Sequence, residues 1–131
     1  MDMEITFDGG KVVTAHFNGH DIKTDQPSFA GGLNSAPTPF ELFLASLGTC
    51  AGIYVKFFCD SRNLPTDGIR IIQHMEFDNQ SGLPLNFEFE IQVPPDFPEK
   101  YHSALVSSAE FCKVKKTIEN PPTFKAYTTV K

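Results

Sequence analysis

The residues of this chain with the most distinctive chemistry are its three cysteines, Cys50, Cys59 and Cys112. A thiolate attacks peroxides and disulfides, whereas a protonated, buried thiol behaves as a small apolar side chain. An odd number of cysteines argues against a structural disulfide framework, and so does an acidic N-terminus without the basic region of a signal peptide. We therefore expect a cytoplasmic protein whose thiols are reduced and serve either packing or redox chemistry.

The spacing of the cysteines separates their roles. Cys59 follows Cys50 on the same expected helix, about 14 Å further along its axis, so the two cannot form a disulfide unless the helix is broken. Cys59 is therefore interpreted as a packing residue. Cys112 comes more than sixty residues after Cys50. If the fold brings these two sulfurs together, a sulfenic acid on one can condense with the other to give a disulfide.

Several other function classes lack their sequence signatures. Net charge is −5 and the 11 Lys and Arg are spread along the chain, so no basic stripe for nucleic acid is visible. There is no Cys-x-x-Cys, His-Glu-x-x-His, Gly-x-Gly-x-x-Gly or P-loop sequence, so we expect neither a metal nor a nucleotide cofactor. His16 and His20 flank an Asn-Gly turn and are interpreted as exposed loop histidines.

The segment that must position Cys50 is a long helix. Thr38-Pro39-Phe40-Glu41 has a capping Thr, a Pro at the first helical position and a Glu three residues after the cap. Apolar residues then recur at helical spacing to about residue 62. Few polar residues interrupt them, so we expect a helix that is buried nearly all round. Glu41, Ser46, Thr49 and Lys56 break the apolar run of residues 40–59, so we expect no membrane span.

The rest of the chain alternates in the manner of antiparallel strands. Residues 3–7, 11–17 and 20–24 predict a small meander with Asn18-Gly19 as a hairpin turn. Residues 69–77 and 85–93 predict a hairpin with one apolar face, which is interpreted as sheet core. Residues 98–111 and 112–118 predict two helices, and residues 123–130 a closing strand. This order predicts an α+β fold with antiparallel sheets around a long central helix.

Two motifs together resemble the OsmC/Ohr family. Residues 36–50 read APTPFELFLASLGTC, which is similar to that family's helix start and its cysteine on the central helix. The second family cysteine opens a short helix and precedes Val, as in Cys112-Lys113-Val114. The resemblance covers nearly the whole chain and implies one OsmC-like domain over residues 1–131. It also implies an intertwined homodimer with its sites at the subunit interface.

The resemblance implies a thiol-dependent peroxidase that reduces organic hydroperoxides and is reduced again by a small or protein dithiol. Cys50 would be the peroxidatic residue and Cys112 the resolving residue. Glu41 would be a further site residue, although its position also suits a helix cap. No cofactor is implied, and neither nucleic acid nor membrane is an expected partner. The apolar residues Phe43, Leu47, Phe57 and Phe58 are expected to line a channel for bulky hydroperoxides.

The chain departs from the family pattern at the groups that activate the reactive thiol. No Arg occurs before Arg62, and Phe40 occupies the family's Glu position, one residue before Glu41. A thiol in the middle of a helix is expected to have a raised pKa on burial. Candidate substitutes for the Arg are Lys11, Lys23, His16 and His20. Two alternatives stay open: a protein that binds a small hydrophobic or sulfur-bearing ligand at the dimer interface, and a redox sensor whose disulfide alters a partner surface.

Overall fold

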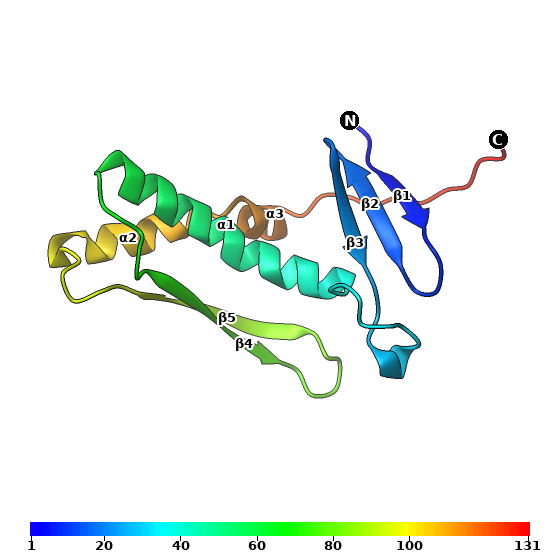
Figure 1. Ribbon diagram of the computed structural model, residues 1–131, viewed down its shortest axis with the longest axis horizontal. Coiled ribbons are helices and arrows are strands. Elements are labelled where there is room, and N and C mark those ends of the chain that lie inside the picture. The colour runs from blue at the N-terminus through cyan, green and yellow to red at the C-terminus, as the bar shows by residue number, and fades with distance from the viewer. The chain divides into compact units, whose positions relative to one another are not determined.

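The computed structural model describes all 131 residues, with five β-strands and three α-helices (Figure 1). The sheets are small and antiparallel, which confirms the predicted α+β class. By its internal contacts the chain divides into two units, Met1–Ala45 and Ser46–Lys131. Helix α1 (Pro39–Ser61) begins in the first unit and continues in the second. The expected single domain over residues 1–131 stays a prediction.

The first unit contains the predicted three-stranded meander. Strands β1 (Glu4–Phe7), β2 (Val13–Phe17) and β3 (His20–Thr24) pair in that order. The turn between β2 and β3 has φ of 52° at Asn18 and 78° at Gly19. Positive φ at both central residues is what the tightest two-residue hairpin requires, and Asn-Gly adopts it at little cost.

His20 begins strand β3 and His16 lies inside strand β2, so the interpretation of both as loop histidines is wrong. The ring of His16 contacts both neighbouring strands. Its Nε2 is 2.9 Å from the Thr6 hydroxyl on β1, and its Nδ1 is 2.7 Å from the Asp21 carboxylate on β3. The hydrogen bond to Asp21 raises the pKa of His16. The His16 side chain therefore links the two strands that flank β2, through Thr6 of β1 and Asp21 of β3.

A buried carboxylate organises the loop between β3 and α1. Asp25 is 1% exposed and accepts hydrogen bonds from the backbone N–H groups of Gln26, Leu33 and Ser35 and from the Ser35 hydroxyl. These bonds, the one from the Ser35 hydroxyl foremost, lower the pKa of Asp25 to about 2. The Asp25 N–H donates to the Pro37 carbonyl at 3.1 Å. The loop is therefore held at both ends, just before α1 begins.

The predicted capping box opens α1. The Thr38 N–H donates to Glu41 Oε1 at 3.0 Å, and the Glu41 N–H donates to Thr38 Oγ1 at 3.1 Å. Two backbone donors at the helix start are thereby satisfied reciprocally. The sequence boundary of the helix was correct to within one or two residues.

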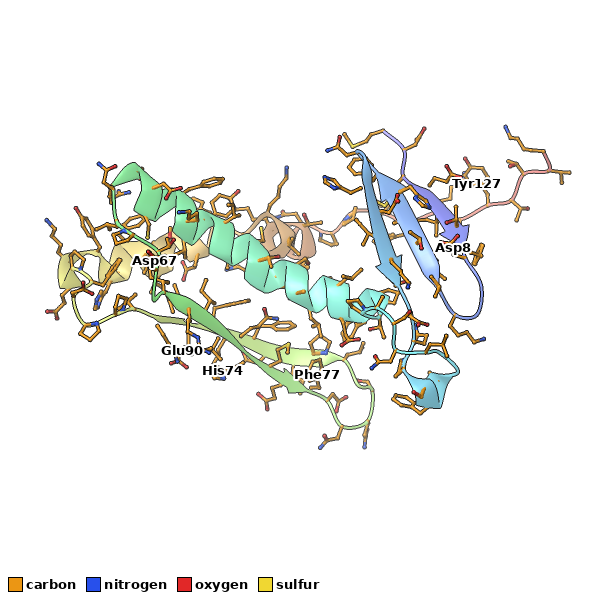
Figure 2. The ribbon with its side chains drawn as sticks, viewed as in Figure 1. Asp8, Asp67, His74, Phe77, Glu90 and Tyr127 are labelled. Atoms are coloured by element: carbon orange, nitrogen blue, oxygen red, sulfur yellow. The ribbon has the colours of Figure 1, made fainter.

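The second unit places the rest of α1 over a hairpin and two shorter helices. The hairpin consists of β4 (Arg70–Phe77) and β5 (Pro84–Gln92), where His74 and Glu90 pair across the strands at 2.9 Å (Figure 2). A 3₁₀ turn, η2 (Glu99–Tyr101), leads into α2 (His102–Ala109), and α3 (Lys113–Glu119) follows. All of these elements were expected from the sequence.

One stripe of α1 packs into the core of this unit. Its buried residues recur about every four positions: Leu47, Ala51, Val55, Phe58 and Cys59. Val55, Phe58 and Cys59 pack with Phe97 and Leu105, against Ile71 and Ile91 of the hairpin. Gly48 allows this close approach, because a Cβ there would lie 2.5 Å from Gln73 Oε1 of β4.

The rest of α1 is not buried within the chain, which corrects the expectation of burial all round. Its most apolar 18-residue window has a mean hydropathy of 1.6, and only 28% of that window is buried. By length and composition alone α1 could cross a bilayer, because its polar residues are too few to prevent it. The absence of a membrane span therefore stays a prediction.

The closing strand expected over residues 123–130 does not form. Residues 121–131 belong to no helix or strand. Alternation of apolar residues indicates only that a segment could be a strand, whereas a strand also needs a neighbour to accept its hydrogen bonds. Phe124, Tyr127 and Val130 are accordingly exposed.

Candidate redox site

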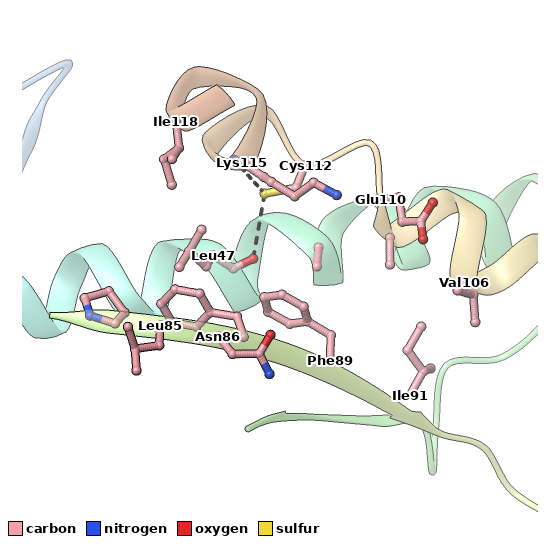
Figure 3. A pocket seen from close by; sticks show the side chains of 14 residues that line it. Leu47, Leu85, Asn86, Phe89, Ile91, Val106, Glu110, Cys112, Lys115 and Ile118 are labelled. Atoms are coloured by element: carbon pink, nitrogen blue, oxygen red, sulfur yellow. Dashed lines mark hydrogen bonds between the residues drawn. The ribbon is translucent and has the colours of Figure 1, made fainter. Parts of the chain in front are cut away.

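The fold of the second unit brings Cys50 of α1 against Cys112 at the start of α3. Cys112 is the N-cap of α3, and its Sγ accepts a hydrogen bond from the Lys115 N–H at 3.3 Å. Its thiol also lies 3.9 Å from the Leu47 carbonyl, to which it can donate (Figure 3). The Cys50 sulfur is the alternative acceptor for this proton, and the Cys112 side chain lowers the Cys50 pKa. The two thiols separated by more than sixty residues in the sequence are therefore neighbours.

The surroundings of Cys50 favour its thiolate. Burial is the largest single influence and raises the pKa of this half-buried thiol. Hydrogen bonds from the Val114 N–H, the Cys112 thiol and the Lys113 N–H act in the opposite direction, as does the Lys113 charge. Together these outweigh burial, so the pKa of Cys50 lies below its ordinary value. The expectation of a raised pKa is thus wrong, because the compensating donors come from a distant part of the chain.

Cys112 is affected in the opposite direction. It is 4% exposed, and burial raises the pKa of its thiol. The Lys115 N–H lowers it by a smaller amount, and the neighbouring Cys50 sulfur raises it again. In the pair, Cys50 is therefore the sulfur that ionises first and Cys112 the one that keeps its proton.

Lys113 is the cation that acts on Cys50, a role for which sequence reasoning considered Lys11, Lys23, His16 and His20. Its side chain is exposed, yet its backbone N–H and its charge both favour the Cys50 thiolate. Its position directly after a cysteine was the signal that could have drawn attention to it.

The other candidate residues lie elsewhere. Glu41 is nine residues before Cys50 on α1, which is two and a half turns, so the two side chains leave the helix on opposite sides. Its carboxylate is bonded to the Thr38 N–H, and this bond lowers its pKa. Cys59 is 0% exposed in the core, where burial raises its pKa. A catalytic role for Glu41 stays a prediction.

A cavity of about 470 Å³ opens beside the sulfur pair (Figure 3). Cys112 lines it and Cys50 does not. Its apolar walls come from α1, β5, α2 and α3, and they include Leu47, Ala51, Phe87, Phe89, Ile91, Val106, Ala109 and Ile118. Lys115 and Glu110 supply charged groups on the same lining. A cavity of this size and character suits a small apolar ligand.

The residues expected to line a hydroperoxide channel are mostly not those that line this cavity, and their role stays a prediction. Of the four residues proposed, only Leu47 lines the cavity, whereas Phe58 is in the core, Phe57 is exposed and Phe43 stacks on Phe40. The apolar face of β5, interpreted as sheet core, supplies the wall instead. No group of three His, Cys, Asp or Glu side chains is placed to hold a metal ion.

Comparison with models of protein families identifies the family of this chain. The model of the family described as OsmC-like protein matches residues 32–126, which include Glu41 and both cysteines of the pair. The chain belongs to the OsmC-like protein family. The family match confirms the resemblance that the two cysteine motifs of this OsmC-like chain indicated. A comparison with curated proteins finds no match.

Solved structures share the fold of this OsmC-like chain. A Psychrobacter arcticus 273-4 protein assigned to the osmotic stress induced and detoxification response superposes with a TM-score of 0.73 at 19% identity, covering 88% of this chain and 85% of its own. A hypothetical protein from Aquifex aeolicus VF5 gives 0.61 at 17%, covering 92% and 87%. The organic hydroperoxide resistance protein OsmC of Legionella pneumophila gives 0.52 at 17%, covering 90% and 89%. At these identities the likeness establishes the fold.

Proposed function

We propose that this OsmC-like chain is a thiol peroxidase that reduces organic hydroperoxides. The observation that carries the proposal is the contact between Cys50 and Cys112, in which the Cys50 pKa is lowered and the Cys112 pKa is raised. A peroxidatic thiol needs to be a thiolate, and a resolving thiol needs to be within reach. The Legionella pneumophila protein of the same fold is a hydroperoxide resistance protein, which supports the assignment.

The first step consumes the peroxide. The Cys50 thiolate attacks the distal oxygen of ROOH, a sulfur–oxygen bond forms and the oxygen–oxygen bond breaks. The electron pair of the broken bond leaves on RO⁻, which takes a proton from solvent to become ROH. The peroxidic hydrogen stays with the transferred oxygen, so Cys50 becomes a sulfenic acid.

The second step forms the disulfide. The Cys112 sulfur attacks the Cys50 sulfur, the sulfur–oxygen bond breaks, and the thiol proton of Cys112 leaves with the hydroxide as water. Cys112 is close enough to Cys50 to act on its pKa, and the two sulfurs must then approach to the disulfide bond length of about 2 Å. A dithiol then returns both cysteines to thiols.

The face of α1 that carries Cys50 favours organic over inorganic peroxide. Ile53 and Phe57 follow one and two turns after Cys50 on that face, and they are 44% and 57% exposed. An alkyl or aryl hydroperoxide can bury its apolar part against them, whereas hydrogen peroxide cannot. Cumene hydroperoxide is therefore expected to react faster than hydrogen peroxide.

Counting thiols tests the proposal. The reduced protein is titrated with cumene hydroperoxide, and free thiols are measured after denaturation. We expect two thiols per chain to be lost at one equivalent, while Cys59 remains. In Cys112→Ser, dimedone should label the sulfenic acid on Cys50 alone, and Cys59→Ala should behave as wild type. Retention of all three thiols in the wild type would contradict the peroxidase assignment.

We also propose that the chain is a cytoplasmic homodimer. The segment after α3 supports association with a second copy, because its exposed Phe124, Tyr127 and Val130 lack a neighbouring strand within the chain, and exposed apolar surface usually marks an interface. Light scattering after size exclusion should give about twice the mass of 14.6 kDa. A single-chain mass at micromolar concentration would contradict the dimer.

A second candidate function rests on the cavity beside Cys112. Its apolar walls and volume also fit a protein that only binds a small hydrophobic or sulfur-bearing ligand. Native mass spectrometry of the purified protein discriminates between the two. A ligand retained equally by wild type and Cys50→Ser, with no thiol loss on peroxide treatment, would favour binding over catalysis.

A further inference from the structure

One face of the meander holds polar side chains that are bonded across all three strands. His16 on β2 lies opposite Glu4 of β1 and opposite Asp21 of β3, and residues paired in this way project on the same side of a sheet. The ring Nδ1 of His16 is 2.7 Å from Asp21 Oδ1, and its Nε2 is 2.9 Å from the Thr6 hydroxyl. That hydroxyl can donate to the Asp8 carboxylate, whose oxygens are 3.1 and 3.2 Å away. We name these four bonded side chains, Asp8, Thr6, His16 and Asp21, the His16 bridge.

The number of protons in the His16 bridge sets the charge of the ring. The Thr6 hydroxyl has a single proton, and a carboxylate only accepts. If that proton goes to Asp8, the Thr6 oxygen accepts from a proton on His16 Nε2. Asp21 then requires a second ring proton, on Nδ1. A neutral imidazole has one N–H, so it leaves either Asp8 without the Thr6 donor or Asp21 without the His16 donor. Only the doubly protonated ring completes every bond.

We propose that the His16 bridge makes the attachment of strand β1 depend on pH: the doubly protonated ring holds β1 in the meander, and loss of a ring proton loosens it. The inference does not depend on the thiol chemistry of Cys50 and Cys112. It concerns the first unit of the chain alone, and it gives that unit a conformational response to pH.

Strand β1 depends on the His16 bridge because few other contacts hold it. It is four residues long, and in the sheet order β1-β2-β3 it is an edge strand. Its apolar side chains Ile5 and Phe7 are 51% and 86% exposed, so they contribute little burial. Short segments with few buried contacts open locally at a low cost in free energy. When β1 opens, backbone groups of β2 lose their partners, and the meander offers an edge to which another strand can add.

The carboxylates around His16 favour its protonated ring. The hydrogen bond to Asp21 is the largest influence and raises the pKa of His16, while partial loss of solvation lowers it. The charges of Asp21, Asp8 and Glu4 raise this pKa further. Lys23, two residues after Asp21, is a cation on the same face of β3. The carboxylates therefore outnumber the cations on this face, and the ring supplies the missing positive charge.

The direction of the pH effect follows from the raised pKa of His16. A group whose pKa is raised on folding contributes its full stabilisation below the unfolded value, here about 6.5, and loses it as the pH rises through the folded value. Above the folded value the cation is gone and one hydrogen bond of the bridge is lost. The carboxylates of Glu4, Asp8 and Asp21 then repel one another without an intervening positive charge.

NMR of the ring tests the protonation state directly. In reduced ¹⁵N-labelled protein, both ring nitrogens of His16 should carry a proton at about pH 6, and the midpoint of the titration should lie above 6.5. Asp21→Asn keeps an oxygen that accepts from Nδ1–H but removes the charge, so it should lower the midpoint. A wild-type midpoint below 6.5, or a singly protonated ring at about pH 6, would overturn the inference.

Hydrogen exchange measures the attachment of β1. Protection factors of the backbone amides of residues 4–7 are obtained by quench-flow labelling at about pH 6 and about pH 8.5, with correction for the intrinsic exchange rate. The amides of Val55 and Phe58 in the core serve as a reference. We expect the protection of β1 to fall about two- to fivefold at the higher pH, as for loss of an exposed ion pair, and the reference to stay constant. Equal protection of β1 at both pH values would contradict the proposal.

Two variants interrupt the His16 bridge at different bonds. His16→Gln cannot be protonated, so β1 should have the same protection at both pH values, close to that of the wild type at the higher pH. Thr6→Val keeps a β-branched side chain in the strand but removes the hydroxyl between His16 and Asp8, so it should reduce the pH response. A full wild-type response in His16→Gln would assign the effect to another group and refute the role of His16.

His74→Gln is the matched control. His74 of β4 forms the same kind of pair, with its Nε2 2.9 Å from Glu90 Oε1 of β5, but it lies in the second unit. This variant should keep the full pH response of β1. Circular dichroism and the protection of the core amides establish that each variant is folded, and the ring titration of the wild type requires no variant. Loss of the β1 response in His74→Gln would contradict the assignment to the His16 bridge.

Discussion

Cys50 and Cys59 lie nine residues apart on one helix, and their thiol pKa values are shifted in opposite directions. Cys59 is 0% exposed among Val55, Phe58 and Leu105, and burial raises its pKa, with the neighbouring Asp60 charge adding to the effect. Cys50 also loses solvation, but backbone N–H groups from the start of α3 lower its pKa. The comparison teaches that burial alone does not decide the reactivity of a cysteine. Donors brought by a distant segment decide it.

The largest difference between the two cysteines should be kinetic. Cys50→Ser is expected to slow the consumption of cumene hydroperoxide by at least about a thousandfold, because the nucleophile itself is removed. Cys59→Ala should retain nearly the wild-type rate, since no donor or cation prepares that sulfur for attack. Stopped-flow measurement of peroxide loss compares the two variants. An equal loss of rate in Cys50→Ser and Cys59→Ala would contradict the assignment of Cys50 as the nucleophile.

For stability we expect the opposite order, with substitution of Cys59 costing more free energy of unfolding than substitution of Cys50. Cys59→Ser places a hydroxyl in the apolar core and should lower the free energy of unfolding by about 1–3 kcal/mol. Cys50→Ser lies at a half-buried position beside N–H donors that a hydroxyl can use, so its loss should be smaller. Urea denaturation of reduced protein measures both. A more stable Cys59→Ser than Cys50→Ser would contradict the core assignment of Cys59.

The pH dependence of alkylation resolves the thiols individually. A lowered pKa means that the thiolate persists to lower pH, so iodoacetamide should modify Cys50 with a midpoint below that of a free cysteine. For Cys112 and Cys59, whose pKa values are raised, the midpoints should lie above it. Peptide mass spectrometry over a pH series gives the three curves. A reversed order of Cys50 and Cys112 would exchange their proposed roles.

The smallest expected effect comes from Lys113. Lys113→Met removes a charge but keeps the backbone N–H, so the Cys50 midpoint should rise only slightly, because that charge is the weakest of the influences on the Cys50 pKa. Because the side chain is exposed, added salt should reduce the difference. Lys116→Met, on the same helix, is the matched control. A larger shift in the control would mean that net charge, not Lys113, acts on the thiol.

Much of the fold was predictable because its signals are local. The Thr38–Glu41 capping box, the Asn18-Gly19 turn and the alternation of β5 each depend on residues close in sequence, and each formed as expected. The closing strand failed because its pattern could not supply a pairing partner. A local pattern predicts a conformation, but not the neighbour that completes it.

The cysteine pair of the site could be predicted from the sequence, whereas the N–H donors that act on Cys50 and the cavity could not. The family resemblance pointed to the contact between Cys50 and Cys112, but the N–H groups of Lys113 and Val114 act on a sulfur more than sixty residues away, and no spacing encodes that approach. The cavity was missed because an apolar strand face looks the same whether it meets a side chain or an empty space. Whether Phe89 packs or lines a cavity depends on the small residues opposite, such as Ala51.

Cys112 caps the start of α3 with its sulfur, so oxidation of that sulfur is expected to change the order of the helix. The Cys112 sulfur accepts the Lys115 N–H and so closes the first turn of a seven-residue helix. Bonding that sulfur to Cys50 redirects it and weakens its hold on the turn, and a helix this short has few other bonds to compensate. The Lys115 amide should consequently exchange its hydrogen faster in the oxidised protein, which makes α3 a reporter of the redox state.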